Sequence, residues 1–399
     1  MGSGIVSKCK IAIIGGGASG LFVASLLSDS GAELTIYEKN NKLGKKILAS
    51  GNGKCNFTNV ENFNGKYNNK FAYEIISKFD VDKTLSIFSK LGLIYKSDNQ
   101  GRCYPISETA NSVLDCLKSK LNRTRILLEK TVEKIANEGN KIAIVCDNKK
   151  DIYDYVICCS GSSASNLGNE KAYSYLKEYN VNFSDIRASL VPVVVKEKVK
   201  ELSGVRVKCV VKLIDDINNI VYFENGEVLF KDNGLSGIAI FNASSYINRN
   251  RSKKYKIVLD ISSGLSEEEL SIYFKSKSKE TLFKGFLNDK LAEYISKKIG
   301  LEQYKFINED ILKKIILTLK NLDFNICDLY PVRDAQVCSG GVSLSEVTSQ
   351  LCLKNNNNIY IAGELLDIDG VCGGYNLQYA WSSAGVIAED IKRKLNEKE

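Results

Sequence analysis

A glycine-rich turn between two apolar segments is the feature that most constrains this chain. Residues 10–20 read Lys-Ile-Ala-Ile-Ile-Gly-Gly-Gly-Ala-Ser-Gly, which places Gly15, Gly17 and Gly20 in G-x-G-x-x-G spacing. An apolar strand-like run precedes the turn, and an apolar helix-like segment over 21–27 follows it. In such a unit the first glycine allows the tight turn, the second lets backbone approach a pyrophosphate, and the third lets the helix pack on the strand.

The residues around this turn complete a dinucleotide-binding pattern. A second strand over 33–37 ends at Glu38, whose carboxylate suits a ribose diol and would repel a 2′-phosphate. Ala18 and Ser19 open the helix, where free N–H groups and the positive end of the dipole favour phosphates. A bare glycine motif also fits a simple tight turn. Because strand, helix and acid all stand where the pattern requires them, we expect an ADP-containing cofactor, with Lys39 in its site.

A second glycine loop over 43–59 carries cations and exposed backbone amides. Lys45, Lys46 and Lys54 stand among its glycines, of which Gly53 is included in the predicted site. Converging cations and amides suit a second set of contacts to a pyrophosphate or to a flavin ring. The alternative is a solvated basic loop.

Several further segments, in the same order and nearly end to end, resemble one flavoprotein family. They are Ser50-Gly-Asn-Gly-Lys-Cys-Asn-Phe-Thr-Asn59, Gly101-Arg-Cys-Tyr-Pro105, Gly226-Glu-Val-Leu-Phe-Lys-Asp-Asn-Gly-Leu-Ser-Gly237, Gly340-Gly-Val342 and Gly363-Glu-Leu-Leu-Asp-Ile-Asp-Gly-Val-Cys-Gly-Gly-Tyr-Asn-Leu-Gln378. The chain is similar to the BaiN-type family of FAD-dependent oxidoreductases, also catalogued as aminoacetone-oxidase-family flavoproteins. It departs from the family pattern at Lys54, where an Arg is usual, and at Ile238, where a Pro is usual.

The resemblance implies FAD bound by a two-dinucleotide-binding-type α/β Rossmann-like domain, with a β-rich barrel-like domain and a small helical domain inserted. We expect Glu364 to contact the ribityl or phosphate side of FAD, and Asn376 to hold the flavin pyrimidine with the N–H groups of the last helix. The predicted cofactor site also contains Cys55, Asn56, Val132, Gly161, Gly363, Gly373, Gly374 and Leu377.

The pattern of the chain predicts how these domains are ordered. We expect the first part of the FAD domain over 1–188, a β-rich domain over 189–260, a helical insert over 261–322, a return strand over 323–336 and the second part of the FAD domain over 337–399.

Local signals predict individual elements within those domains. Adenine-side strands are expected over 129–132 and 142–145, a buried strand over 155–161, and a turn at Asn225-Gly226 between short strands. The remaining expectations are a capping box at Ser266–Glu269, helical segments over 283–291 and 312–322, a strand region over 332–342 and a final helix over 380–395.

Composition bounds the class of protein. No apolar run reaches the roughly 18–20 residues of a membrane helix, and residues 1–8 form no signal peptide, so we expect a cytoplasmic protein. The twelve cysteines include no C-x-x-C and the chain has no His, so we expect no metal site and mostly buried thiols. The net charge of +8 comes from scattered lysines, and we expect a solvated surface rather than a nucleic-acid partner. The oligomeric state is left open.

The first functional hypothesis follows the resemblance: NAD(P)H-dependent reduction of a carbon–carbon double bond conjugated to a ketone, as in a steroid or bile acid. NADH or NADPH is expected to visit transiently, because no second complete dinucleotide motif occurs. The alternatives are oxidation of a small amine such as aminoacetone, an RNA-binding flavoprotein of tRNA modification, and a non-catalytic flavin scaffold. Without His, the candidates for catalysis are Tyr375, Arg333 and Arg102.

Overall fold

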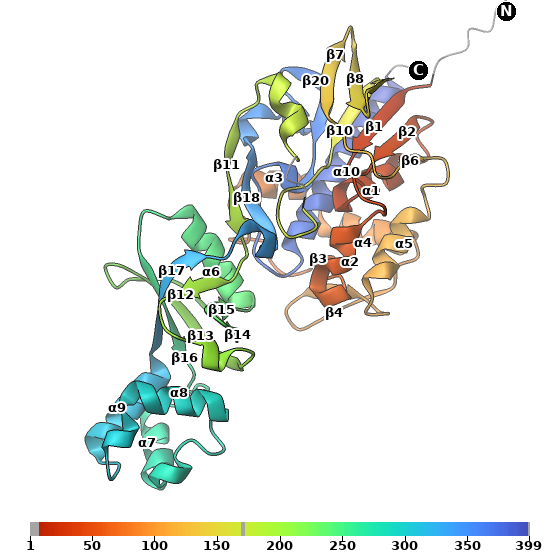
Figure 1. Cartoon of the computed structure of the whole chain (residues 1–399). Helices are drawn as coiled ribbons and strands as arrows, with labels where there is room; N and C mark the ends of the chain where they lie inside the picture. Colours follow the sequence, from red (N-terminus) through yellow and green to blue (C-terminus); the bar gives the residue numbers. More distant parts are fainter. Residues whose placement is uncertain (1–7, 169–171, 398–399) are drawn as a thin grey trace, which may run out of the picture. The chain divides into compact units, whose positions relative to one another are not determined.

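The computed structural model describes residues 8–168 and 172–397, and the chain divides into two compact units (Figure 1). The first unit consists of Met1–Arg187 and Val337–Glu399, and the second of Ala188–Gln336. Each unit has its own cluster of buried apolar side chains. The second unit is therefore an insertion with a separate core.

The first unit is built on a mostly parallel six-stranded sheet in the order β19-β20-β10-β1-β2-β6. Its strands are β1 (Lys10–Ile14), β2 (Glu33–Tyr37), β6 (Arg125–Leu127), β10 (Tyr155–Cys158), β19 (Cys352–Leu353) and β20 (Asn356–Ile361). β1 pairs in parallel with both β2 and β10, so Ile11 lies opposite Leu34 and Tyr155. Its core side chains are fully buried, as the near-continuous apolar run predicts for a covered parallel strand.

Helices and small sheets surround this sheet (Figure 1). The helices are α1 (Ala18–Leu27), α2 (Lys45–Ala49), α3 (Phe71–Lys78), α4 (Val81–Lys90), α5 (Ala110–Lys118) and α10 (Tyr375–Asn396). The small sheets contain β3 (Thr58–Asn59), β4 (Tyr95–Ser97) and β5 (Arg102–Pro105); β7 (Lys134–Glu138), β8 (Lys141–Cys146) and β9 (Lys149–Tyr153); and β11 (Phe183–Ser189) with β18 (Val337–Val342). α1 packs on β1, β2 and α10, so the first and last helices share one core.

The second unit contains a closed antiparallel barrel in the order β12-β15-β14-β13-β16-β17. The strands are β12 (Val193–Val195), β13 (Arg206–Asp215), β14 (Ile220–Lys231), β15 (Gly234–Ser236), β16 (Tyr255–Asp260) and β17 (Leu322–Leu329). The helices are α6 (Ile238–Arg249), α7 (Glu267–Lys275), α8 (Asp289–Ile299) and α9 (Glu309–Lys320). The predicted fold class, a Rossmann-like domain with an inserted barrel and helices, is confirmed.

Of two local predictions, the capping box is right and the turn is wrong. The capping box is confirmed: the Ser266 hydroxyl accepts from the Glu269 N–H at 3.1 Å, and the Glu269 carboxylate accepts from the Ser266 N–H at 2.8 Å. The predicted turn at Asn225-Gly226 is wrong, because β14 runs through it. A Cβ at Gly226 would stand 3.0 Å from the Ala239 Cβ, so this glycine lets α6 approach the strand. The real turn follows Asp215, whose carboxylate accepts from two backbone N–H groups.

Other element predictions need correction at their bounds. Residues 129–132 are not a strand: Glu129 has a left-handed φ of 57°, and its N–H and that of Lys130 donate to carbonyls of the loop after β2. The helix expected from residue 283 begins only at Asp289, behind the Asn288 cap, and the last helix begins five residues early, at Tyr375. Among the described residues, no helix is both long and apolar enough to cross a membrane.

Candidate functional site

The turn between β1 and α1 is closed so tightly that only glycine fits at its two ends. Gly15 has a φ of 109°, and a Cβ there would lie 2.4 Å from the Cys159 carbonyl oxygen. A Cβ at Gly20 would lie 1.9 Å from the carbonyl oxygen of Gly15. Gly17 differs, since a Cβ there would meet no protein atom within 4 Å. The backbone at Gly17 is therefore open to a ligand, while its flanking glycines hold the helix against the strand.

Glu38 is a buried carboxylate at the end of β2, where the sequence predicts the ribose contact. Its Oε2 accepts from the Gly16 N–H at 2.8 Å, and its Oε1 accepts from the Asn40 N–H at 2.8 Å. The Asn40 side-chain amide also donates to Oε1, at 2.6 Å, so these bonds leave about one acceptor position of the roughly four that a carboxylate has. The adjacent Lys39 donates through its ammonium to the Gly168 carbonyl. Glu38 thus lies beside the glycine turn, and Lys39 lies beside the loop that follows β10.

The second glycine loop folds back onto the first. The Gly44 N–H donates to the Gly16 carbonyl at 2.9 Å, and α2 begins directly afterwards with Lys45 and Lys46. Lys45 lines a cavity of about 600 Å³ together with Asn41, Lys42, Leu48, Ala49 and Leu167. The predicted convergence of cations beside the glycine turn is therefore present on this side of the loop.

Glu364 joins three segments that are far apart in sequence. Its Oε2 accepts from the Lys46 ammonium at 2.7 Å, and its Oε1 accepts from the Ser162 hydroxyl at 2.6 Å and from the Cys338 N–H at 3.1 Å. The preceding Gly363 lies so close to α1 that a Cβ there would stand 2.3 Å from the Ser19 Oγ. Gly161 is also close to Glu364, since a Cβ at Gly161 would lie 4.0 Å from the Glu364 Oε2.

A network of hydrogen bonds ties the end of the second loop to the start of α10. The Thr58 hydroxyl donates to the Gln378 Oε1 at 2.5 Å, and the Trp381 indole donates to the Phe57 carbonyl at 2.7 Å. The Asn59 amide donates to the Gly373 carbonyl at 2.9 Å. Gly374 has a φ of 96°, and a Cβ there would stand 2.6 Å from the Thr58 carbonyl oxygen. The second loop and the start of α10 therefore meet only because Gly374 carries no side chain at this point.

This junction holds a buried acceptor without a protein partner. The Oδ1 of Asn56 is buried and accepts no hydrogen bond within the described part of the chain. Beside it, Cys55 is fully buried with a left-handed φ of 56°, and burial raises the pKa of its thiol to about 11. A neutral thiol and an open carbonyl acceptor are suited to contacts with a polar ring edge that supplies N–H groups.

The first turn of α10 presents its backbone rather than its side chains. Gly374 is the N-cap without a side-chain cap bond, so the N–H groups of Asn376 and Leu377 follow at the positive end of a 22-residue helix. The Asn376 side chain is engaged elsewhere: its amide donates to the Gly370 carbonyl, and its Oδ1 accepts from the Gly370 N–H, both at 2.8 Å. Asn376 thus shapes the 370–376 turn, and its expected flavin contact remains a prediction.

The catalytic candidates lie in different surroundings. Tyr375 is buried, with its ring edge-on to Phe63 and Tyr67, and burial raises its pKa. Arg102 lies in β5 opposite Asn59, and its guanidinium donates to Asp98 at 2.7 Å. Their catalytic roles stay predictions.

Arg333 belongs to the second unit. Its side chain is 75% exposed, and its guanidinium lies 3.9 Å from the carboxylate of Asp334. Arg333 is therefore carried by a different unit from the other predicted site residues, and its catalytic role also stays a prediction.

Two further residues of the predicted cofactor site are Lys54, in the second glycine loop, and Val132, before β7. Lys54 is an exposed cation that donates to Glu108 at 2.6 Å. This bond and the bond from Lys96 lower the pKa of Glu108 to about 2.

Val132 is buried in the segment before β7, and within the described residues no hydrogen bond occupies its backbone. Its free N–H and carbonyl are compatible with the expected adenine edge.

Tyr173 is a candidate that sequence reasoning missed. Its hydroxyl is buried without a partner among the described residues. Burial, and then the negative charge of Glu364, raise its pKa. The residue follows a serine-rich loop with no motif of its own, so only tertiary proximity to Glu364 reveals it.

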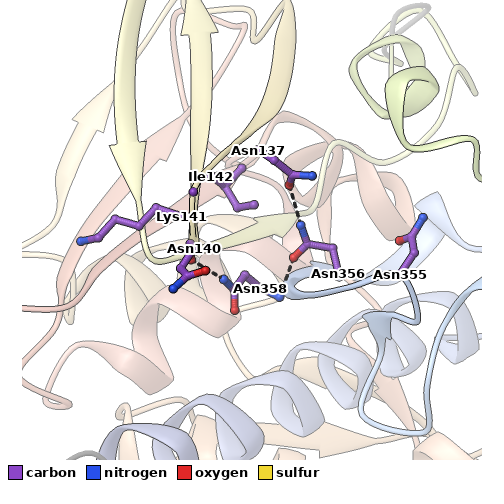
Figure 2. A pocket seen from close by; sticks show the side chains of 8 residues that line it. Asn137, Asn140, Lys141, Ile142, Asn355, Asn356 and Asn358 are labelled. Carbon is purple, nitrogen blue, oxygen red and sulfur yellow. Dashed lines mark hydrogen bonds between the residues drawn. The ribbon is translucent and has the colours of Figure 1, made fainter.

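A second depression lies apart from these residues (Figure 2). It is lined by asparagines of β7, of the β7–β8 turn and of the start of β20, and some of these bond to one another: Asn356 donates to Asn137 at 2.7 Å and Asn358 to the Asn140 carbonyl at 2.8 Å. These hydrogen-bonded asparagines include no residue of the predicted site. None of the twelve cysteines, all of which lie in residues 8–168 and 172–397, forms a disulfide, and no group of three or more metal-ligating side chains occurs in these residues.

The first unit thus fits FAD in its donor set. The open backbone at Gly17, the buried acceptor of Glu38, the cations of α2, the partnerless Oδ1 of Asn56 and the free N–H groups of α10 match the successive polar groups of a flavin dinucleotide.

Comparisons with known proteins agree with this geometry. A family model described as HI0933-like protein Rossmann domain matches residues 9–390. The chain is 30% identical to a 3-dehydro-bile acid delta(4,6)-reductase of Clostridium scindens, over 94% of this chain and 97% of the relative. It is 29% identical to a ribosomal RNA dihydrouridine synthase of Haemophilus influenzae, over 96% of this chain and 98% of the relative.

Among solved structures, the chain resembles a 3-ketosteroid-delta4-(5alpha)-dehydrogenase from Rhodococcus jostii in complex with 4-androstene-3,17-dione. The TM-score is 0.49 at 9% identity, covering 97% of this chain and 98% of the other.

Proposed function

Because the chain belongs to the HI0933-like family of FAD-dependent oxidoreductases, we propose that it reduces a carbon–carbon double bond conjugated to a carbonyl group. Two relatives with unrelated substrates support this reaction. A 3-dehydro-bile acid with a delta-4 double bond carries an alkene conjugated to its 3-ketone, and the reduced bond of a dihydrouridine is conjugated to the C4 carbonyl in uridine. The observation that carries the proposal is that both relatives are named for substrates or products whose reacting carbon–carbon double bond is conjugated to a carbonyl group.

The chemistry of such a bond divides between cofactor and protein. FAD, when bound and reduced by NADH or NADPH, would supply the hydride for the carbon distant from the carbonyl. The chain holds the dinucleotide through the glycine turn, Glu38, α2 and the start of α10. The N-terminus of α10 supplies positive potential, which favours the negative charge that develops on a reduced ring system or an enolate.

A proton must reach the carbon next to the carbonyl. The chain has no His, and the candidates to supply it are Tyr, Lys, Arg and Cys side chains near the flavin. Tyr173 fits this role because its buried hydroxyl, which can donate a proton, has no partner within the described residues. Tyr375, Arg102 and Arg333 remain the further candidates.

The first candidate substrate is a steroid or bile-acid-like enone, with NADH or NADPH as a transient reductant, which corresponds to a BaiN-type reductase. The bile acid reductase relative supports it. The twelve cysteines form no disulfide in the described part of the chain, which supports the proposal that the enzyme works in a reducing cytoplasm.

The second candidate substrate is a uracil base of ribosomal RNA. The formal net charge of +8 favours a polyanionic partner, and the dihydrouridine synthase relative supports it. The expectation of no nucleic-acid partner stays a prediction, and this candidate is the alternative to it.

The test is an anaerobic titration of the FAD-loaded protein with NADH and NADPH, followed at the oxidised-flavin absorbance, and then reoxidation of the reduced protein by substrate. A 3-oxo-4-ene steroid and unmodified ribosomal RNA are offered in parallel, with their saturated counterparts as matched controls. Reoxidation by either unsaturated compound alone supports the proposal. Reduction by aminoacetone instead of a nicotinamide, with no reoxidation by an alkene, would replace it by the amine oxidase alternative.

A further inference from the structure

The β13–β14 hairpin of the inserted barrel ends in exposed apolar side chains. Ile217 is 68% exposed, Ile220 58% and Phe223 67%. Phe223 lies directly opposite Lys212 in the antiparallel ladder. A solvent-exposed phenylalanine flanked by isoleucines costs solubility without any gain in packing, which points to a contact made with a partner.

A basic loop lies beside this hairpin tip. The segment 249–256, Arg-Asn-Arg-Ser-Lys-Lys-Tyr-Lys, joins α6 to β16. The Lys253 ammonium pairs with Asp215 at 3.0 Å, and the Lys256 ammonium donates to the Asn218 Oδ1 at 3.4 Å, so both bonds fasten the loop to the tip.

Most of the positive charge of this loop is not neutralised within it. The Arg251 guanidinium donates to the neutral Asn248 Oδ1 at 3.0 Å, and the partner of Lys256 is a neutral amide. Lys254 is exposed and forms no ion pair within the described residues. Cations with neutral partners keep their charge available for phosphates.

We propose that this tip surface, made of Lys212, Ile217, Ile220, Phe223, Arg251, Lys254 and Lys256, binds unpaired RNA. Phe223 stacks on a base, the isoleucines cover its neighbours, and the cations contact the backbone phosphates. The inference rests on the ribosomal RNA alternative of the proposed function and gives it a place on the molecule.

Tertiary structure changes what the basic segment can offer to a nucleic acid. In sequence, the segment contains only one aromatic residue, Tyr255, which is too few for a stacking platform. Tyr255 is in fact buried, with its hydroxyl donating to the Asn250 carbonyl at 2.9 Å, whereas the hairpin brings the exposed Phe223 to the same end of the barrel. Cations interleaved with an exposed aromatic ring are the arrangement that single-stranded nucleic acids recognise.

The test measures binding of a short fluorescein-labelled, uridine-rich RNA to the FAD-loaded protein by anisotropy over a range of salt concentrations. Phe223→Ala should weaken binding about tenfold with an unchanged salt slope, since stacking is lost. Lys254→Ala should lower the slope of log affinity against log salt by about 0.7, since one phosphate contact is lost.

The chain offers a matched control in the same unit. Lys305 and Phe306 are adjacent and exposed in the loop before α9, and Phe306 is 81% exposed. Lys305→Ala and Phe306→Ala should leave both affinity and slope unchanged. The proposal would be overturned if the control variants at Lys305 and Phe306 weakened RNA binding as much as the variants at Lys254 and Phe223. Binding to anionic phosphatidylglycerol vesicles in place of RNA would also overturn it.

The experiment separates this inference from the proposed reaction. RNA binding that depends on Phe223 and Lys254 supports the surface even when no alkene reoxidises the flavin. The enzyme can also turn over an enone or uracil while neither variant changes the affinity for RNA. That result supports the proposed reaction and overturns the proposal that the tip surface binds RNA.

Discussion

Replacing Gly17 by alanine should separate cofactor binding from folding. Gly17 has φ −89° and ψ −160°, an extended conformation that alanine adopts readily, and the added methyl would meet no protein atom within 4 Å. The free energy of unfolding without FAD should therefore change by no more than about 0.5 kcal/mol.

The cofactor should respond very differently to the same methyl group. At Gly17 the backbone must come close to the pyrophosphate, so a methyl there displaces the phosphate from the N–H groups of α1. Loss of one charge-assisted hydrogen bond costs about 1.5–3 kcal/mol. The dissociation constant for FAD should rise about ten- to hundredfold, measured by titration of flavin fluorescence.

Gly20→Ala is the matched comparison. Its Cβ would lie 1.9 Å from the Gly15 carbonyl oxygen, so α1 must move off β1. Overpacking of this kind costs about 1–3 kcal/mol, and thermal unfolding without FAD should show it. A Gly17→Ala variant that binds FAD like the parent, or that unfolds as early as Gly20→Ala, would refute this reading of the turn.

Three further predictions concern the residues around the turn. Asn56→Ala removes a buried acceptor without a protein partner, so it should leave stability without FAD intact while FAD affinity falls about fivefold, checked by the same titration. Glu364→Gln removes the charge that pairs with Lys46 and should cost about 1 kcal/mol in urea unfolding; no loss beyond that of the exposed Glu389→Gln would contradict it. The Cys55 thiol has a pKa of about 11 when folded against 9.0 unfolded, so its stabilisation is complete below pH 9 and is lost as the pH rises through 11. Cys55→Ala should reduce that alkaline loss by about 2–3 kcal/mol, and identical pH profiles would exclude it.

Signals confined to a few neighbouring residues were sufficient for much of the fold. The strand–glycine–helix order around Gly15 and Gly20 depends on backbone sterics within a dozen residues, and the structure shows both contacts that exclude a side chain. The capping box at Ser266–Glu269 is equally local. The flavoprotein family and the α/β class with an inserted barrel follow from such patterns.

Errors arose where a distant contact decides the local structure. Asn225-Gly226 has turn composition, yet it lies within β14, because the missing side chain there serves the packing of α6. Residues 129–132 end in the β-prone pair Thr131-Val132, but the backbone N–H groups of Glu129 and Lys130 donate to the loop after β2. Local propensity is a weak preference of about 1 kcal/mol or less per residue, and tertiary packing overrides it.

The sequence by itself therefore predicts an ADP-containing cofactor at the first turn, because the pattern that predicts it consists of neighbouring glycines and one acid. Only tertiary structure decides which distant groups complete the site. The junction of Asn56 with Gly374, the bridge from Glu364 to Lys46 and the placing of Tyr173 near Glu364 join segments up to about three hundred residues apart. Such contacts are set by how helices and strands pack into one core, and a pattern read along the chain does not contain that information.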